Sequence, residues 1–398
     1  MSEALDKARF EEDVYAGIKV IDVDTHFSEP LDLWTSRSPA KFKDRMPRMV
    51  EHEGRPLWVI DEDTSLGHRS AASVVGKDGS KDRGTSFLWL TADEVHPSSY
   101  GTRERLAYMD ESSIWAQVLY PNVLGFAGQR AGQVDPELRL LATQIYNDAT
   151  AEMQAESGDR LLPMALLPWW DIKLALAEAE RCHEMGMRGV NINSEPHHHG
   201  MQPLHGEYWN PLWEFCSDKG LPINFHIGAS DSTSTWYGDS PWPGLDDSYR
   251  MALGSTMMFF SNAKIISNLI YSGLLERFPA LNFVSVESGL GWIPFILEAL
   301  DYEYLEAGAD KTNPLSMKPS DYFRRQIYGC FWFENENIIE TIRQIGVDNV
   351  MFETDYPHPT CLYPEPLEMG REVLGKLSFE DRHKVLCGNA ARVYRLDV

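Results

Sequence analysis

Residues 20–26, "VIDVDTH", carry the pattern from which the fold of this chain can be inferred. Their apolar positions are β-branched valine and isoleucine, which are typical of a strand buried in a parallel sheet. Asp22, Asp24 and His26 are spaced two residues apart, so their side chains share one face of that strand. A buried carboxylate lowers stability by several kcal/mol unless a partner or a cation compensates its charge. The pattern therefore predicts a core strand that carries a polar site.

Similar apolar runs recur along the chain and alternate with amphipathic segments. The predicted strands are residues 20–26, 116–121, 161–168, 188–193, 222–228, 281–287, 326–333 and 349–355. The predicted helical segments are residues 134–157, 171–185, 208–219, 250–276, 291–306 and 336–345. Strands that alternate with helices in this number indicate an α/β fold, a (β/α)8 TIM barrel formed by residues 1–398 as a single domain. An open doubly wound sheet is the alternative, although no GxGxxG motif follows the first strand.

Two long segments interrupt this alternation. Residues 27–102 separate the first strand from the first clear helix, "TRERLAYMDES", and contain "EGRPLWVIDED", which predicts a hairpin, and the polar loop "GKDGSKDRGTS". An insertion of this length after a barrel strand is typical of a lid or small subdomain over the active site. The second segment, residues 229–249, is rich in Ser, Gly, Pro and Trp and predicts an active-site flap.

Composition and charge restrict the partners. The chain is 43% hydrophobic and 24% charged, and its net charge of −24 argues against nucleic acid and anionic membrane surfaces. No apolar run approaches the roughly 20 residues that cross a bilayer, and "MSEALDKARFEED" lacks the pattern of a secretory leader. The five cysteines are scattered without a CxxC pair. We therefore expect reduced thiols, no zinc–thiolate site and a cytoplasmic protein.

Polar side chains stand at the ends of four predicted strands. Asp24 and His26 end the first strand, His226 the fifth, Glu287 the sixth and Asp355 the eighth. The carboxyl ends of all strands meet at one mouth of a barrel, where imidazole and carboxylate groups can hold one divalent cation. A single aspartate at a strand end is as often a helix cap, and a single histidine is more often a hydrogen-bonded core residue. Their coincidence at several strand ends favours a metal site.

Other residues are candidates for contact with a substrate. His358 lies between two prolines just after Asp355, where it can orient a substrate or the water on the metal. Tryptophans near strand ends suggest a roomy cavity for a ring-bearing small molecule, and Arg103, Arg105 or Arg130 can pair with a carboxylate, although core packing and surface ion pairs are the ordinary roles of these residue types. The candidate substrate-binding residues are Glu29, Trp34, Arg130, Trp236 and Trp292. Asp22 is expected to bond groups behind the site, and His197, His198 and His199 to lie in a solvated loop.

The motifs "DVDTHFSEPLDLW", "GLPINFHIG", "YSGLLERFPALNFVSVESGLGWIPF", "FETDYPHP" and "GNAARVY" carry a family resemblance. The chain resembles the amidohydrolase superfamily, in the amidohydrolase-2 branch that includes aminocarboxymuconate-semialdehyde, resorcylate and carboxyvanillate decarboxylases. The resemblance implies a barrel with one divalent metal, zinc or manganese in most members, held here by Asp24, His26, His226 and Asp355. It also implies a homodimer or higher homo-oligomer. The predicted fourth strand lacks the bridging lysine of the binuclear members, which favours a mononuclear centre.

Two departures from the family pattern bear on the reaction. The first-strand pair is Asp24-x-His26 where the family more often has His-x-His or Glu-x-His, and a carboxylate there brings Fe²⁺ and Mg²⁺ into competition with Zn²⁺ and Mn²⁺. Glu287 stands where the decarboxylases have a proton-handling histidine. We therefore expect a hydrolase of an amide, ester or related carbonyl bond, with Asp355 and Glu287 moving protons. The alternatives are a non-oxidative decarboxylase of an aromatic or unsaturated acid, and an inactive barrel that serves as a binding subunit.

Overall fold

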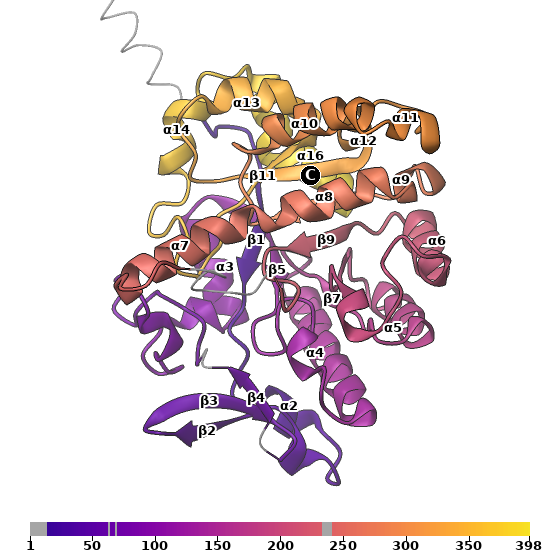
Figure 1. Ribbon diagram of the computed structural model, residues 1–398. Helices are drawn as coiled ribbons and strands as arrows, with labels where there is room; N and C mark the ends of the chain where they lie inside the picture. Colours follow the sequence, from indigo (N-terminus) through magenta and orange to yellow (C-terminus); the bar gives the residue numbers. More distant parts are fainter. Residues whose placement is uncertain (1–13, 63, 68–69, 233–240) are drawn as a thin grey trace, which may run out of the picture.

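The computed structural model describes residues 14–62, 64–67, 70–232 and 241–398. Within these residues, parallel strands form one sheet at the centre of the molecule, in the order β6-β5-β1-β12-β11-β10-β9-β8-β7 (Figure 1). The strands are β1 (Val20–His26), β5 (Ile114–Tyr120), β6 (Leu161–Pro163), β7 (Ala165–Leu166), β8 (Val190–Asn191), β9 (Ile223–His226), β10 (Phe283–Val286), β11 (Ile327–Phe331) and β12 (Val350–Phe352).

The sheet is closed into a barrel. Its two outermost strands, β6 and β7, are consecutive parts of one run that is interrupted only at Met164. The first part pairs with β5 and the second with β8, so this single run closes the ring. The barrel therefore has eight strand positions in sequence order, and the predicted (β/α)8 TIM barrel is confirmed.

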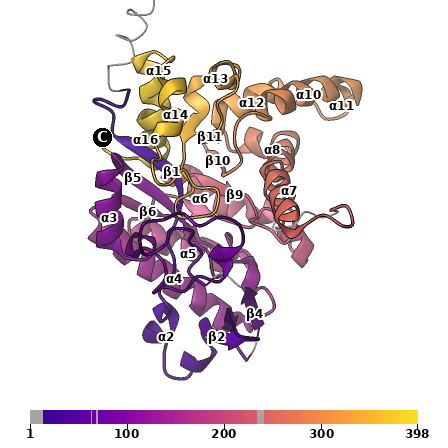
Figure 2. The same cartoon turned by 90° about the vertical axis from the view of Figure 1, so that its left-hand side faces the viewer.

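Helices surround the barrel, as Figure 2 shows from the side. The helices are α2 (Leu33–Arg37), α3 (Thr102–Glu111), α4 (Pro136–Glu156), α5 (Ile172–Glu184), α6 (Asn210–Lys219), α7 (Asp247–Phe259), α8 (Ser261–Tyr271), α9 (Leu274–Arg277), α10 (Ile293–Glu306), α11 (Ala309–Thr312), α12 (Pro319–Gln326), α13 (Ile338–Ile345), α14 (Glu368–Leu374), α15 (Phe379–His383) and α16 (Asn389–Tyr394). The segment 250–276, predicted as one helix, is broken into α7, α8 and α9. The second break lies at Gly273, whose φ of 74° is left-handed and ends an α-helix. None of the helices in the described ranges combines the length and the apolar character that crossing a bilayer requires.

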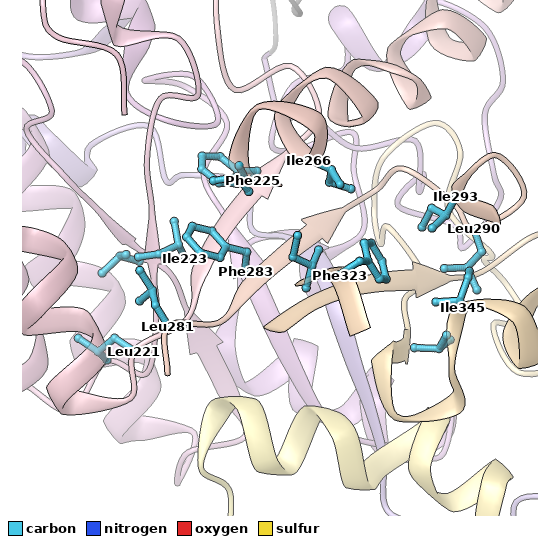
Figure 3. Packing of buried hydrophobic residues seen from close by; sticks show 14 of the residues in the cluster. Leu221, Ile223, Phe225, Ile266, Leu281, Phe283, Leu290, Ile293, Phe323 and Ile345 are labelled. Carbon is cyan, nitrogen blue, oxygen red and sulfur yellow. The ribbon is translucent and has the colours of Figure 1, made fainter. Parts of the chain in front are cut away.

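The main core lies between the strands and the helices that cover them (Figure 3). Phe225 on β9 and Phe283 on β10 are neighbours in the sheet, with parallel rings 6.1 Å apart. Ile266 of α8 and Ile293 of α10 pack onto the same cluster from the helical layer. Full burial of such a side chain stabilises the fold by about 1.5–3 kcal/mol, so this layer holds the strand ends in place.

The insertion after β1 contains a small antiparallel sheet of β2 (Arg48–His52), β3 (Arg55–Ile60) and β4 (Thr64–Gly67). β2 and β3 form a hairpin whose turn residues, Glu53 and Gly54, both have positive φ, as a tight two-residue turn requires. Both views place this sheet at the end of the molecule opposite α10 and α13 (Figures 1 and 2). Its role as a lid stays a prediction.

Candidate metal centre

The strand-end residues singled out in the sequence lie together in the barrel mouth. Asp24 and His26 come from β1, His226 ends β9, Glu287 follows β10, and one ligand atom of each lies within 4.8 Å of the others. Asp355, three residues after β12, forms a second group of this kind with His26 and His358. All of these residues are buried. The fold thus joins residues from four strands into one cluster of possible metal ligands.

The two imidazoles point toward each other. His26 Nε2 lies 3.1 Å from His226 Nε2. His226 Nδ1 lies 2.6 Å from the backbone oxygen of Ile227, and because a carbonyl only accepts, Nδ1 carries the proton of the neutral ring. The Nε2 of His226 then presents a lone pair, and Glu287 Oε2 and Asp24 Oδ1 lie 3.2 Å and 3.5 Å from it. These electron-rich atoms converge on one buried point, which favours its occupation by a cation.

Asp24 supplies the strongest sign of an expected cation. Both of its carboxylate oxygens are buried, and neither has a hydrogen-bond partner among the described residues. Burial and the nearby charges of Asp355 and Asp22 raise the pKa of Asp24 well above its usual value. A buried carboxylate without donors is strongly unfavourable, whereas a divalent cation compensates its charge directly. The residues present therefore fit a metal ion.

The backbone conformation directs the two carboxylates that follow β10 and β12 into the barrel mouth. Glu287 and Asp355 have φ angles of 55° and 58°, the left-handed region that costs a side-chain-bearing residue about 1–3 kcal/mol. The Glu287 N–H donates to Glu353 Oε2 at 3.1 Å, and the Asp355 N–H donates to the Asp24 carbonyl at 2.9 Å. These hydrogen bonds hold each strained residue at its strand end, so that its side chain turns into the mouth.

Asp22 lies behind the cluster, as expected. Its carboxylate accepts hydrogen bonds from the Gln117 amide at 3.0 Å and from the Thr354 hydroxyl and N–H at 2.6 Å and 2.9 Å. Burial raises the pKa of Asp22 to about 7, although these hydrogen bonds oppose the shift. Asp22 thereby joins β1, β5 and the chain after β12 beneath the cluster.

Arg105 also lies behind the strand rather than in the mouth. Its guanidinium donates to the backbone oxygens of Ser98 and His26, both at 2.6 Å, and to Gln117 Oε1 at 3.2 Å. The side chain is fully buried, so its charge supports the backbone of His26 instead of facing a substrate. Arg103 is almost fully exposed and lies 3.8 Å from Glu104.

His358 is fixed by a chain of hydrogen bonds that the sequence did not reveal. The Asn122 amide donates to the Phe27 carbonyl at 3.0 Å and to Glu29 Oε2 at 3.3 Å, which leaves its Oδ1 facing His358 Nε2 at 2.8 Å. The His358 ring stacks on His26 at 3.5 Å, and its Nδ1 lies 3.3 Å from Asp355 Oδ1. The one available signal for Asn122 is its place two residues beyond β5, at the barrel mouth.

None of the four predicted substrate-binding residues that the structure describes lines the cavity beside the cluster. The Glu29 carboxylate accepts from the backbone N–H groups of Asn122 and Val123. Trp34 is fully buried and donates to the Ala142 carbonyl, so it contributes to packing. The remaining positions are as follows: Arg130 donates to the Leu66 carbonyl, Trp292 donates to the Ser288 carbonyl, and Trp236 lies outside the described residues.

The histidine run contacts the first residues of the predicted flap, which follow β9. His199 Nε2 lies 3.0 Å from Asp231 Oδ2, and the Glu195 carboxylate accepts hydrogen bonds from the hydroxyls of Ser230 and Ser232. His197 and His198 are exposed. Residues 233–240 of the predicted flap lie outside the described residues, and α7 begins within its last part.

The cavity beside the cluster is small in this conformation. Its volume is about 20 Å³, room for roughly one water molecule. It is lined by Phe126, Ile227, Ser255, Met258, Phe259, Glu287, His358, Pro359 and Thr360. Of these, only Glu287 and His358 were selected from the sequence; Phe126, on the loop between β5 and α4, and Met258, on α7, are among the residues that it did not single out.

Comparison with known proteins identifies relatives by sequence and solved structures with a similar fold. Gamma-resorcylate decarboxylase from Polaromonas sp. (strain JS666 / ATCC BAA-500) is 27% identical to this chain over 264 residues, 63% of this chain and 75% of the relative. The solved structure of amidohydrolase map2389c from Mycobacterium avium subsp. paratuberculosis K-10 aligns with a TM-score of 0.71 and 21% identity, over 96% of this chain and 99% of that one. A dihydroxybenzoic acid decarboxylase from Polaromonas sp. JS666, solved with bound manganese and the inhibitor 2-nitroresorcinol, aligns with a TM-score of 0.57 and 20% identity, over 95% and 97%.

The match to a family model covers the whole barrel. The model described as amidohydrolase matches residues 21–396, from β1 to just beyond α16, and so includes every strand end that contributes to the cluster. The chain belongs to the amidohydrolase family.

Proposed function

We propose that this chain is a metal-dependent, non-oxidative decarboxylase of an aromatic carboxylic acid. The observation that carries the proposal is the convergence of His26, His226 and the donor-free carboxylate of Asp24 on one buried point. The curated relatives, which are gamma-resorcylate decarboxylases, support this reaction over hydrolysis. The expectation of a hydrolase rested on Glu287, which stands in place of a family histidine but can itself carry a proton.

One divalent ion would be held by Asp24, His26 and His226, with Asp355 and Glu287 next to them. When bound, it supplies positive charge that attracts the substrate carboxylate and stabilises negative charge developing on the substrate. The manganese in the related Polaromonas structure and the carboxylate-rich residue set support Mn²⁺, and zinc is the alternative. The complete residue set argues against an inactive barrel.

Asp355 is the residue we assign as the proton carrier. Its Oδ2 accepts from the Thr360 hydroxyl at 2.5 Å, which leaves Oδ1 toward His26 and His358. The proton adds to the ring carbon that bears the carboxylate, the bond from that carbon to the carboxylate breaks, and its electron pair returns to the ring as carbon dioxide leaves. No oxidant or reductant is needed. Glu287 is the second candidate for this proton, and His358 orients Asp355.

The test is a parallel assay of both reactions. The protein, loaded with Mn²⁺ or with Zn²⁺, is incubated with hydroxybenzoic acids while carbon dioxide release is recorded, and separately with amides, esters and lactones. We expect carbon dioxide release that a chelator abolishes and that metal restores. Metal-dependent cleavage of the amides or esters without any carbon dioxide release would overturn the proposal in favour of hydrolysis.

A further inference from the structure

Phe126 is the side chain that covers the candidate metal centre. Its ring centroid lies 4.1 Å from that of His226, 5.3 Å from that of His26 and 5.9 Å from that of His358. It also lines the small cavity beside the cluster. A flat ring in this place presents an apolar face to anything that approaches the centre.

The backbone beneath Phe126 is anchored from three sides. The Asn191 amide donates to the Phe126 carbonyl, and the Trp169 indole donates to the Ala127 carbonyl at 2.9 Å. The Gln129 amide donates to the Gly228 carbonyl at 2.9 Å and accepts from the Ala127 N–H at 3.0 Å. The donors come from β8, from the chain after β7 and from the loop itself, so Phe126 is the fixed wall of the cavity.

A second wall of the cavity belongs to α7, in which few side chains are buried. Of the 13 residues of α7, Gly254 and Met258 are the buried ones. Half-buried Met251 and Phe259 also pack on the barrel, Phe259 with its ring 5.7 Å from that of Trp332, so a few side chains hold this helix. Met258 points into the cavity that Phe126 lines. Methionine is unbranched and changes rotamer readily, which makes it the more adaptable wall.

Both side chains lie against Gly228, which follows β9. A Cβ built on Gly228 would lie 3.2 Å from Met258 Cε and 3.3 Å from Phe126 Cδ2, and its φ of 69° favours glycine. Their approach to this glycine narrows the cavity beside the centre. The resulting volume of about 20 Å³ is far below the roughly 300 Å³ of the smallest common ligand pockets, so one wall must yield before a ring can enter.

We propose that Phe126 and Met258 determine which aromatic acids the site accepts, with Phe126 as the fixed face for the substrate ring and Met258 as the face that moves. The inference rests on the proposed function, because it takes an aromatic acid as the ligand. Single-ring acids fit when Met258 changes rotamer. Fused-ring acids require the space that Met258 occupies.

The experiment compares Phe126→Leu, Met258→Ala and the control Met257→Ala, a change at an exposed neighbour on the same helix. KM and kcat are measured with a hydroxybenzoate and a hydroxynaphthoate. Met258→Ala should lower the ratio of the KM for the fused-ring acid to the KM for the single-ring acid about tenfold, which is the size of effect expected when a pocket is enlarged. Phe126→Leu should raise KM for the single-ring acid by a similar factor, and Met257→Ala should leave both values unchanged. An unchanged ratio in folded Met258→Ala protein would overturn the proposal.

A binding measurement separates this inference from the proposed function. The affinity of manganese-loaded protein for 2-nitroresorcinol and for a nitronaphthol, neither of which can lose carbon dioxide, is measured by calorimetry. If no acid is decarboxylated but Met258→Ala still gains affinity for the fused-ring ligand, the proposed reaction is wrong and the proposed role of Phe126 and Met258 is supported. If acids are decarboxylated but Met258→Ala binds the fused-ring and single-ring ligands with the same affinity ratio as wild type, the proposed role of Phe126 and Met258 is wrong and the proposed reaction stands.

Discussion

His26 and His226 bring their Nε2 atoms to 3.1 Å of each other across 200 residues of chain. The bond from His226 Nδ1 to the Ile227 carbonyl fixes which nitrogen holds the proton, so this approach places a lone pair beside the carboxylates of Asp24 and Glu287. Like-charged and electron-rich groups repel one another strongly in a buried site. The fold tolerates this arrangement because a cation can occupy the point on which the four side chains converge.

Metal removal should therefore weaken the fold as well as abolish activity. We expect about one equivalent of Mn²⁺, Fe²⁺ or Zn²⁺ per chain, because the ligands form one cluster. An ion that binds only the folded state stabilises it by about 2.7 kcal/mol at a concentration about 100 times its Kd. Mass spectrometry of bound metal and thermal unfolding with and without chelator test this expectation.

The matched variants for this test are His226→Ala and His205→Ala, the second at an exposed histidine outside the cluster. The first should lose the metal and the metal-dependent shift in Tm, and the second should keep both. Equal metal content in the two variants, or less than about half an equivalent in wild-type protein after loading, would remove the basis for a metal centre.

Much of the barrel could be predicted because strand residues carry a strong local pattern. The runs that became β1, β9 and β12 are apolar, β-branched or aromatic, and end in Asp or His where the chain enters the barrel mouth. The family resemblance then fixed the closed topology. What failed was the continuity of residues 250–276, because the break before α8 at Phe260 has no glycine or proline to signal it.

The site could be predicted only where its residues lie on strands or shortly after a strand end. His26 and His226 follow from strand periodicity, whereas Asn122, Phe126 and Met258 reach the centre through loop and helix placement that is set by long-range packing. Arg105 illustrates the opposite error, since an arginine that supports a buried strand and one that binds a substrate look alike in sequence. The carboxylates of Asp355 and Glu287 can carry protons in hydrolysis or in decarboxylation, so the sequence alone did not decide between the two reactions.

Asp355→Asn should abolish turnover while the fold persists. Asparagine matches aspartate in shape and can keep the contact with Thr360, but its amide cannot carry the proton that we assign to Asp355. Loss of a positioned acid or base lowers the rate by about 10²–10⁴-fold. Steady-state kinetics, with circular dichroism and metal content as folding controls, test the assignment, and full activity in the variant would overturn it.

Arg105→Met should destabilise the protein rather than change its substrate affinity. The variant leaves the backbone oxygens of Ser98 and His26 without their buried donor, and each buried acceptor left without a partner costs about 1–3 kcal/mol. Arg103→Met, at an exposed site, should change the free energy of unfolding by less than about 0.5 kcal/mol. Urea unfolding of both variants measures this difference, and an Arg105 variant of wild-type stability with raised KM would restore its role in substrate binding.

The expected homo-oligomer has a specific surface to test on α10. Phe295, Tyr302 and Leu305 are each more than half exposed on this helix, whereas Leu297 and Leu300 are buried against the barrel. A second copy of the chain is the occupant we predict for this apolar face, since large exposed apolar side chains are typical of interfaces. Light scattering after gel filtration should give a dimer for wild-type protein and for Glu303→Gln, and a monomer for Phe295→Glu. A monomeric wild-type protein would contradict the prediction.

Glu195 should stabilise the fold in a pH-dependent way. Burial raises its pKa, but hydrogen bonds from Ser230, Ser232 and Lys264 outweigh burial and lower the pKa from 4.5 to about 2. A carboxyl whose pKa is lower in the folded state stabilises the fold above its unfolded pKa, and this stability is lost as pH falls from 4.5 toward 2. The effect is on the order of 3 kcal/mol, since each pKa unit corresponds to about 1.4 kcal/mol. Urea unfolding from about pH 6 to about pH 3 should therefore give Glu195→Gln a free energy of unfolding far below that of wild type at the higher pH. At the lower pH the two free energies should approach each other. Glu214→Gln, at an exposed site, should have the free energy of unfolding of wild type at every pH. If Glu195→Gln lowers the free energy of unfolding by the same amount at every pH, the ionised carboxylate is not what stabilises these loops.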